Sequence, residues 1–295
     1  HGGVRYLRQG NVSLVMEALR ERGILRRLAP HLVREVAFVV PSYAWWQSPF
    51  YGVGLRMYDM LAGREGFGHS RHLSREEVAR RIPNIETDEL RGGTLYWDGQ
   101  FDDARLAIEI ARTAADRDAV LVNHCPVTGL LKGSDGMIHG ALARDEESGE
   151  TFEVPAKVVV NATGPFADEL RRMDRPDAEP IIAPSQGVHL VLDRSFLAGD
   201  DAIMVPSTPD GRVMFAIPWN GRVVVGTTDT PIELVEAEPR PLPMEEAFIL
   251  ETAGRYLERR PTPDDVLSRF AGIRPLVKAG PAGDTAALSR EHAIL

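Results

Sequence analysis

Val158-Val159-Val160-Asn161-Ala162-Thr163-Gly164-Pro165 is the stretch around which the rest of the chain is organised. Three successive valines without a charge are typical of a β-strand that is buried on both faces. Proline suits the first turn of a helix, because it has no N–H group to leave unpaired, so a helix is predicted over 166–173. Small residues at such a corner let a ligand approach the backbone. Ordinary corners of α/β sheets share this spacing, so both interpretations stay open.

The bulk composition is that of a globular protein. The 295 residues allow one large or two ordinary domains, and 43% of them are hydrophobic. No apolar run approaches the roughly 20 residues of a membrane-spanning helix. The net charge of −9 argues against nucleic acid as the main partner. Cys125 is the single cysteine, which excludes an internal disulfide and fits a reducing compartment, and the histidines lack metal-ligand spacing.

Helices and strands alternate in the first part of the chain. Asn11 or Ser13 is predicted to cap a helix with an apolar stripe from Leu14 to Leu25 and with Arg20, Glu21 and Arg22 in solvent. A strand over 35–40 precedes the aromatic segment 43–51, which leads into a second helical pattern. Ser74 and Glu77 form a capping box for a helix that ends at Arg81.

From Gly92 onward the pattern changes. A strand over 95–97 is followed by a helix that opens at Asp102 or Asp103 and by a strand over 119–123. Three short β segments come next, with Gly-containing turns between them, and lead into Val158: 127–132, 137–144 and 151–154.

The second half predicts an antiparallel sheet. Its expected strands are 188–192, 202–205, 213–218, 222–227 and 266–275. Pro209-Asp210-Gly211 and Asn220-Gly221 are strong hairpin signals. An amphipathic helix is expected over 244–259, with Phe248, Ile249, Ala253 and Leu257 facing inward.

Two groups of residues were weighed as ligand-binding motifs. Gly52-Val53-Gly54 is rejected as a dinucleotide fingerprint, because neither a third glycine nor a leading strand accompanies it. Arg5, Arg274 and Arg290 each lie beside glycine, proline or a strand end. A guanidinium held by rigid backbone suits recognition of phosphate or carboxylate, although surface arginines are common in this lysine-poor chain.

Four motifs in order carry a family resemblance: 1–7 (HGGVRYL), 160–165 (VNATGP), 226–230 (GTTDT) and 272–276 (GIRPL). Together they resemble the FAD-dependent glycerol-3-phosphate dehydrogenase family over essentially the whole chain. The family's N-terminal βαβ unit with the Gly-rich fingerprint and its C-terminal part have no counterpart here, so the sequence is interpreted as an internal fragment. The resemblance implies a two-domain α/β flavoprotein fold with mixed α+β character, in which an FAD-binding domain with a β meander is interleaved with an antiparallel substrate domain.

The resemblance also implies domain boundaries and site residues. The FAD-binding domain takes in 1–40 and 92–175, the substrate-binding domain takes in 41–91 and 176–270, and 271–295 returns to their interface. The implied site residues fall into three groups. FAD would contact His1, Gly2, Gly3, Val127, Ala162, Thr163, Gly164 and Gly272. The substrate phosphate would be held by Arg5, Tyr6, Arg274 and Arg290, with Thr228 and Asp229 at the rim of the cleft. Catalysis would use His189 or His1 as the base and Arg274 to stabilise a developing alkoxide.

The implied reaction is oxidation of sn-glycerol 3-phosphate to dihydroxyacetone phosphate, with FAD as hydride acceptor and a quinone as the next electron acceptor. A glycerol-3-phosphate oxidase, another flavin (amine) oxidase of the same fold and an inactive cofactor-free fragment are the alternatives. The expected location is the cytoplasm, with peripheral contact to the inner face of the cytoplasmic membrane. Trp45–Tyr51 would provide that contact, unless these rings pack beneath the following helix, which is the preferred interpretation. The oligomeric state is not predicted.

Overall fold

The computed structural model describes residues 11–206, 208 and 212–278. The chain divides into two compact units, each assembled from separate stretches of sequence. Of the described residues, unit 1 comprises those within 11–106, 186–230 and 238–272, and unit 2 comprises those within 107–185, 231–237 and 273–278. Mixed α/β structure with a separate antiparallel sheet was predicted, and this prediction is confirmed.

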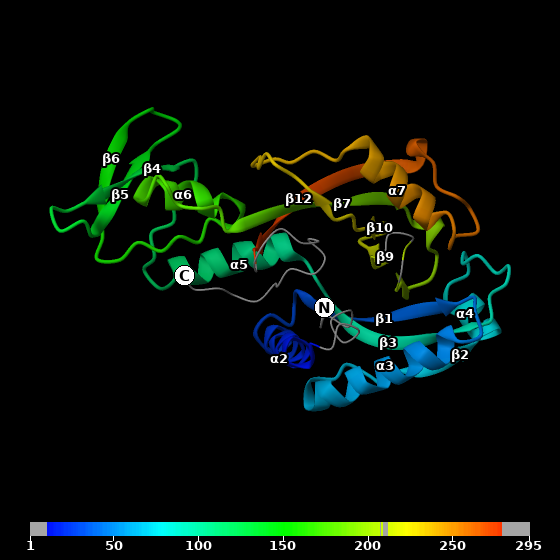
Figure 1. The fold of residues 1–295 in the computed structure, drawn as a ribbon. Helices are drawn as coiled ribbons and strands as arrows, with labels where there is room; N and C mark the ends of the chain where they lie inside the picture. The colour runs from blue at the N-terminus through cyan, green and yellow to red at the C-terminus, as the bar shows by residue number, and fades with distance from the viewer. Residues whose placement is uncertain (1–10, 207, 209–211, 279–295) are drawn as a thin grey trace. The chain divides into compact units, whose positions relative to one another are not determined.

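A mixed sheet forms the framework of unit 1 (Figure 1). Within the described residues it has nine strands in the order β11-β7-β10-β9-β8-β1-β3-β2, and β12 also pairs with β7. Pairing is antiparallel between β1 and β3 and parallel between β1 and β8. The strands are β1 (Val33–Ser42), β2 (Arg71–Ser74), β3 (Gly92–Phe101), β7 (Ile182–Asp193), β8 (Ala202–Val205), β9 (Met214–Trp219), β10 (Arg222–Gly226), β11 (Thr230–Pro231) and β12 (Val266–Val277).

Strand β1 shows why this sheet is buried on both faces. Successive side chains of a strand point to opposite faces. Ala37 and Val39 belong to one apolar cluster, whereas Phe38 and Val40 belong to the other. The first cluster includes residues of α4 (Arg75–Arg81) and α7 (Pro243–Ala253), and the second includes residues of α2 (Val12–Leu28) and α3 (Gln47–Ala62). The sheet therefore has a helical layer on each face.

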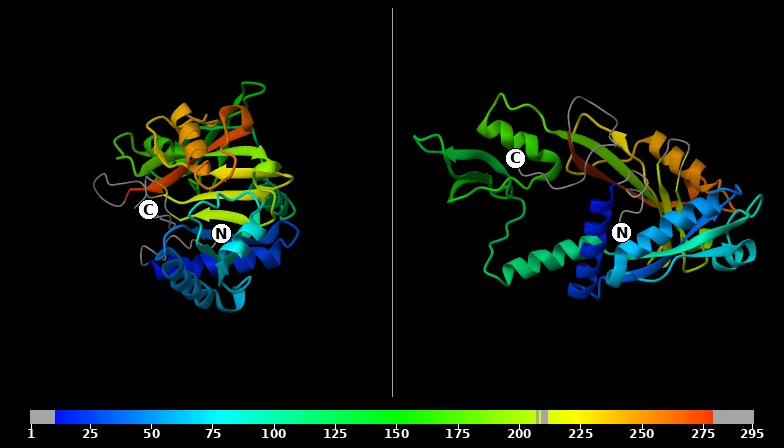
Figure 2. Two further views of the ribbon diagram at one scale, coloured as in Figure 1. Left: turned by 90° about the vertical axis from the view of Figure 1, so that its right-hand side faces the viewer. Right: turned by 60° about the horizontal axis from the view of Figure 1, so that its bottom comes forward.

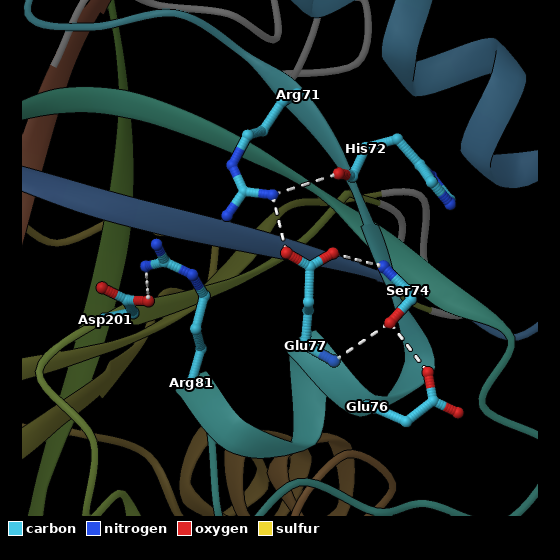
Figure 3. A network of polar contacts seen from close by, with 7 residues as sticks. All are labelled: Arg71, His72, Ser74, Glu76, Glu77, Arg81 and Asp201. Atoms are coloured by element: carbon cyan, nitrogen blue, oxygen red, sulfur yellow. Dashed lines mark hydrogen bonds and ion pairs between the residues drawn. The ribbon is translucent and has the colours of Figure 1, made fainter.

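Local signals fixed the ends of several elements. Asn11 caps α2, its side chain accepting a hydrogen bond from the Leu14 N–H at 3.2 Å. At the start of α4 the Ser74 hydroxyl accepts from the Glu77 N–H while the Glu77 carboxylate accepts from the Ser74 N–H, and Figure 3 shows this reciprocal box. Asn220 and Gly221 have φ values of 45° and 73°, which a tight hairpin turn requires. All three features were predicted.

Unit 2 contains a second, smaller sheet (Figure 2). Strands β4 (Val127–Lys132), β5 (Ile138–Arg144) and β6 (Thr151–Pro155) form an antiparallel meander that agrees closely with the predicted segments. Helix α6 (Ala167–Asp174) packs against β4, and α5 (Asp103–Ala115) leads into this unit.

Short 3₁₀ helices occur in both units: Gly63–Glu65, Arg194–Phe196 and Pro263–Asp265 in unit 1, and Gly164–Phe166 in unit 2.

Two predicted strands are wrong. Residues 119–123 and 158–163 are not in strand conformation, and Val158 and Val160 are 74% and 78% exposed. A strand needs neighbouring backbone to satisfy its N–H and C=O groups. Among the described residues no strand pairs with either segment.

Two further details differ from the prediction. Arg22 was expected in solvent, but its side chain is only 5% exposed and pairs with Asp98 at 2.8 Å, because a carboxylate on β3 lies beside the helix stripe. Helix α7 ends at Ala253 rather than at 259, although Ile249, Ala253 and Leu257 are buried as expected. The Pro209-Asp210-Gly211 turn lies outside the described residues, but β8 and β9 on either side of it do pair.

The compact units cut across the predicted domain boundaries. The FAD-binding domain was predicted to contain 33–40 of β1 and all of β3, and these two strands pair along their whole length in unit 1, which also includes 186–230 and 238–272. The functional roles given to 1–40 with 92–175, to 41–91 with 176–270, and to 271–295 therefore stay predictions.

Candidate active site

His189 lies on β7, the strand that was expected to carry a catalytic base. Gly226 of β10 is its register partner. A Cβ atom at Gly226 would lie only 2.5 Å from Cδ2 of His189, so glycine is required for the imidazole to pack over this backbone. The ring also stacks on Phe270, with centroids 5.1 Å apart and planes at 15°. The imidazole is therefore held between an aromatic ring and a close backbone segment.

The residues after Gly226 are buried. Thr228 and Asp229 are 1% and 7% exposed, and their predicted place at the rim of the substrate cleft stays a prediction. The Thr228 hydroxyl accepts a hydrogen bond from the Val188 N–H and donates one to Glu245. This places a threonine hydroxyl between the backbone next to His189 and a buried carboxylate.

The turn over 161–164 is exposed and internally hydrogen-bonded. The side-chain oxygen Oδ1 of Asn161 accepts from the Thr163 hydroxyl at 2.8 Å. The side-chain nitrogen Nδ2 of Asn161 donates to the Ala167 backbone carbonyl at 2.9 Å. Gly164 has a φ of 56°, and no atom lies within 4 Å of the position a Cβ would take. Backbone is thus presented with open space in front of it.

Asp168 anchors the helix that follows this turn. Its carboxylate accepts from the N–H groups of Ile181 and Ile182 and from Arg171. Burial raises the pKa of Asp168, but these hydrogen bonds and the guanidinium outweigh it, so the pKa lies below its ordinary value. The start of α6 is therefore tied to the chain entering β7.

The remaining predicted site residues are scattered over both units. Arg274 is half-buried on β12 within unit 2, Gly272 is exposed on the same strand, and Val127 begins β4. His1, Gly2, Gly3, Arg5, Tyr6 and Arg290 lie outside the described residues. In unit 1 the structure brings together His189, Gly226 and Thr228, whereas Ala162, Thr163 and Gly164 share one turn of unit 2.

Two of the residues that were predicted to contact FAD are glycines of the described part of the chain. Gly164 in unit 2 and Gly272 in unit 1 each have open space where a side chain would stand, as do six other described glycines, so their role at FAD stays a prediction. The exposed turn at 161–164 leads into the 3₁₀ turn Gly164–Phe166, in which Pro165 has no N–H and the Phe166 N–H donates to the Thr163 carbonyl. Among residues 11–206, 208 and 212–278, no group of three or more His, Cys, Asp or Glu is arranged to hold a metal ion.

The part of the chain that the structure describes contains no helix long and apolar enough to cross a membrane.

Comparison with known proteins identifies the class. The family model described as FAD dependent oxidoreductase matches residues 1–292, and the chain belongs to this family. FAD is the cofactor that the family uses.

Curated relatives narrow the class further. The mitochondrial glycerol-3-phosphate dehydrogenase of Macaca fascicularis is 41% identical over 313 residues, covering 100% of this chain and 42% of that protein. The corresponding protein of Schizosaccharomyces pombe is 39% identical and is covered to 49%. The chain thus spans a little under half the length of these relatives.

Solved structures agree with this placement. The glycerol-3-phosphate dehydrogenase from Bacillus halodurans complexed with FAD is 32% identical, with a TM-score of 0.74 over 88% of this chain and 47% of that one. The L-alpha-glycerophosphate oxidase from Mycoplasma pneumoniae, at 19% identity and a TM-score of 0.68, covers 89% of this chain and 68% of its own, and it shows the shared fold.

Sequence reasoning missed two buried polar residues of this region, Gln186 and Glu245. Glu245 lies at the third position of a helix that begins with Pro243, where a glutamate ordinarily caps the helix in solvent. No periodicity signals that its carboxylate also reaches β7 and the Thr228–Thr230 segment.

Proposed function

We propose that this chain is part of an FAD-dependent dehydrogenase that oxidises sn-glycerol 3-phosphate to dihydroxyacetone phosphate. The observation that carries the proposal is identity of about 40% across the full chain to enzymes named glycerol-3-phosphate dehydrogenase. The FAD-complexed bacterial dehydrogenase, at 32% identity, supports it from structure. Both relatives are longer than this chain, so the activity belongs to a protein extended to their length.

The reaction removes a hydride from C2 of the substrate and a proton from the C2 hydroxyl. FAD, when bound, supplies the hydride acceptor. In the proposal His189 accepts the proton, and its packing between Phe270 and Gly226 supports this role because a fixed imidazole needs little reorganisation. His1 is the second candidate for the base.

The proposal assigns the FAD contacts to His1, Gly2, Gly3, Val127, Ala162, Thr163, Gly164 and Gly272. Gly164 and Gly272 have open space in front of their backbone, as six other described glycines do, so these two assignments rest on the family resemblance. The substrate phosphate would be bound by Arg5, Tyr6, Arg274 and Arg290. A phosphate dianion in a partly closed site must be paired, because an unpaired buried charge costs several kcal/mol.

The test is Arg274→Ala in the full-length enzyme, assayed on glycerol 3-phosphate and on glycerol. A charge-assisted hydrogen bond is worth about 1.5–3 kcal/mol, so kcat/KM for the phosphorylated substrate should fall roughly 10- to 150-fold. Glycerol has no phosphate to lose and should be affected much less. Arg269→Ala is the matched control, since Arg269 lies on the same strand and pairs with Glu246. Equal losses on both substrates would place Arg274 at the reacting carbon, and no loss would remove it from the site.

A quinone is the proposed electron acceptor, and molecular oxygen is the alternative that an oxidase would use. Turnover of glycerol 3-phosphate with a soluble quinone analogue under nitrogen, compared with hydrogen peroxide release in air, separates the two. Peroxide formation as fast as quinone reduction would contradict the dehydrogenase assignment.

Helix α3 supports peripheral contact with a membrane. Its outer face carries apolar side chains at helical spacing: Trp46, Phe50, Val53, Met57 and Met60. The preferred interpretation of the sequence, that the rings of Trp45–Tyr51 pack beneath the helix, is wrong for Trp45, Trp46 and Phe50, which are 78%, 48% and 56% exposed. Tyr51 is partly buried and does pack against the apolar cluster. Such a face suits the interface of a bilayer.

Positive charge lies beside this face. Arg56, Arg71 and Arg91 line a groove of about 640 Å³ that also includes Trp45. Arg71 is ion-paired with Glu77 at 2.9 Å, so Arg56 and Arg91 carry the proposed headgroup contact. Arginine pairs readily with phosphate, so the proposal places lipid headgroups against this groove. The local charge would offset the net charge of −9.

Flotation with vesicles containing phosphatidylglycerol tests the contact. Val53→Glu with Met60→Glu should abolish flotation of the full-length enzyme, because both side chains lie on the outer face of α3. Leu28→Glu is the control, since Leu28 is 76% exposed but belongs to α2. Unchanged flotation of the double variant would contradict the proposal.

A further inference from the structure

Glu245 carries a buried carboxylate that accepts four hydrogen bonds. Its residue is 2% exposed. Oε1 accepts from the hydroxyls of Thr228 and Thr230, at 3.0 and 2.6 Å. Oε2 accepts from the Gln186 side-chain amide and from the Leu242 N–H, at 2.7 and 2.9 Å. Every group that contacts the two oxygens is a donor, which matches the acceptor capacity of a carboxylate.

Helix capping alone does not explain this arrangement. A glutamate at this position needs one hydrogen bond to the N–H at the helix start, which here is the bond from Leu242. The other three donors come from β7, β11 and the segment before β11. Burying a carboxylate is costly, so a solvent-exposed glutamate would cap α7 with less desolvation.

The contacts through Thr228 lead to the backbone beside His189. The Val188 N–H donates to the Thr228 hydroxyl at 3.0 Å, and that hydroxyl donates to Glu245. Gln186, two residues before Val188 on the same strand, binds the other carboxylate oxygen. Glu245 thus holds β7 at Gln186 and, through Thr228, at Val188. Thr230 donates its hydroxyl to the same oxygen as Thr228, but Thr230 meets β7 through the backbone pairing of β11, which loss of the hydroxyl leaves in place.

We propose that Glu245 is a positioning residue for His189: by fixing Gln186 and Thr228 it sets the backbone from which the imidazole projects over Gly226. This inference rests on the proposed function, in which His189 accepts the substrate proton. Positional errors of about 1 Å in such a group cost roughly 100-fold in rate. The effect should fall on kcat, since Glu245 holds no substrate.

Four single variants of the full-length, FAD-loaded enzyme test the inference. Glu245→Gln keeps the shape of the side chain but replaces one carboxylate oxygen by an NH₂ group. Two of the four hydrogen-bond donors around Glu245 then face another donor instead of an acceptor. Glu246→Gln is its control, because it removes an equal charge from the same helix turn. Thr228→Val and Thr230→Val are matched to each other: each removes one hydroxyl that donates to Oε1, but only Thr228 also binds Val188.

We expect Glu245→Gln and Thr228→Val to lower kcat for glycerol 3-phosphate roughly 10- to 100-fold with KM within about threefold. Thr230→Val should lower the thermal midpoint of unfolding about as much as Thr228→Val does, but it should lower kcat less than about threefold. Glu246→Gln should leave kcat within about twofold of the wild-type value. The Glu245→Gln/Thr228→Val double variant should be no slower than the worse single one, because the two residues act as a unit.

A second measurement is independent of activity. Hydrogen exchange at the backbone of 186–190 should accelerate in Glu245→Gln and Thr228→Val and stay unchanged in Thr230→Val. Equal exchange and equal kcat losses in the two threonine variants would overturn the inference, as would losses that multiply in the double variant. If the wild-type enzyme failed to oxidise glycerol 3-phosphate, the proposed function would fall, while the exchange data would still decide whether Glu245 fixes β7.

Discussion

The central sheet of unit 1 and the valine-rich segments of unit 2 have similar sequences and opposite outcomes. Phe38-Val39-Val40 lies in β1 with every side chain at most 3% exposed. Val158-Val159-Val160 is equally apolar, yet it is not a strand and its first and third side chains are mostly exposed. Strand β1 has β3 on one side and β8 on the other. Apolar sequence therefore makes a strand only where neighbouring backbone is present.

This difference has a consequence for the longer relatives. Residues 119–123 and 158–160 expose apolar side chains to an extent that is unusual for a folded chain. In a protein extended to the length of the relatives, we expect additional strands to pair with these segments. Slow hydrogen exchange at Val120–Val122 and Val158–Val160 in the extended protein would support this, and exchange as fast as in 1–295 alone would contradict it.

The largest loss in the free energy of unfolding is expected at the buried ion pair between Arg22 and Asp98 in unit 1. Asp98→Ala leaves Arg22 without its main partner among side chains that are almost fully buried. Breaking a buried pair by removing one partner costs about 3–5 kcal/mol. The free energy of unfolding, measured by urea denaturation, should fall by this amount. The Tyr58 hydroxyl, which also donates to Asp98, loses a partner as well.

A control separates charge from packing. In Arg22→Met/Asp98→Leu both charges are replaced by apolar groups, and the loss should be smaller than in Asp98→Ala. A double variant that is less stable than the single one would show that the ion pair itself stabilises the sheet.

Core truncation compares the two regions directly. Leu190→Ala, on β7, should cost about 2–5 kcal/mol because the side chain is fully buried. Leu121→Ala makes the same chemical change in unit 2, where Leu121 is 55% exposed, and should stay within about 0.5 kcal/mol. Similar losses for the two variants in denaturant unfolding would mean that the segment around Leu121 is packed in solution.

The sequence predicted those features that depend on local chemistry. The Asn11 cap, the Ser74–Glu77 box and the Asn220-Gly221 hairpin each use residues a few positions apart, so the signal and the structure share one short segment. The meander strands were also placed correctly, because each strand pairs with the next.

Long-range partners could not be predicted in the same way. Arg22 can be buried because its guanidinium pairs with Asp98, which lies 76 positions away in the sequence. Gln186 and Thr228 lie 59 and 17 positions from Glu245. A charged residue on a predicted helix gives no sign of a partner on a distant strand, so burial of Arg22 and Glu245 required the structure. The site residues Arg274 and His189 rest on family resemblance rather than on spacing.

An intermediate effect is expected at Asp168 in unit 2. Its pKa is lowered in the folded state, so its stabilising contribution is present above the unfolded value of about 3.9 and is lost as pH falls through the folded value. Below about pH 4, hydrogen exchange at the Ile181 and Ile182 amides should therefore speed up beyond the intrinsic pH effect. Asp168→Asn should show little such pH dependence and a loss of roughly 1.5–3 kcal/mol at pH 7. Identical pH profiles for the two proteins would contradict this account.

The smallest effect is expected at the ion pair that joins β4 to α6. Lys132 and Asp174 are 3.0 Å apart, as close as a good pair requires, but their side chains are 38% and 36% exposed. Water screens such a pair and ordering two long side chains opposes it, so Lys132→Ala should cost about 0–1 kcal/mol. Repeating the denaturant unfolding in 1 M salt should reduce even this difference, because the screening length then falls to about 3 Å. The Asp98→Ala loss should change little in the same salt, since Arg22 and Asp98 are shielded from solvent. If Lys132→Ala lowered the free energy of unfolding by more than about 2 kcal/mol, and salt did not reduce this loss, the exposed pair in unit 2 would stabilise the protein as strongly as a buried pair does, which would contradict this account.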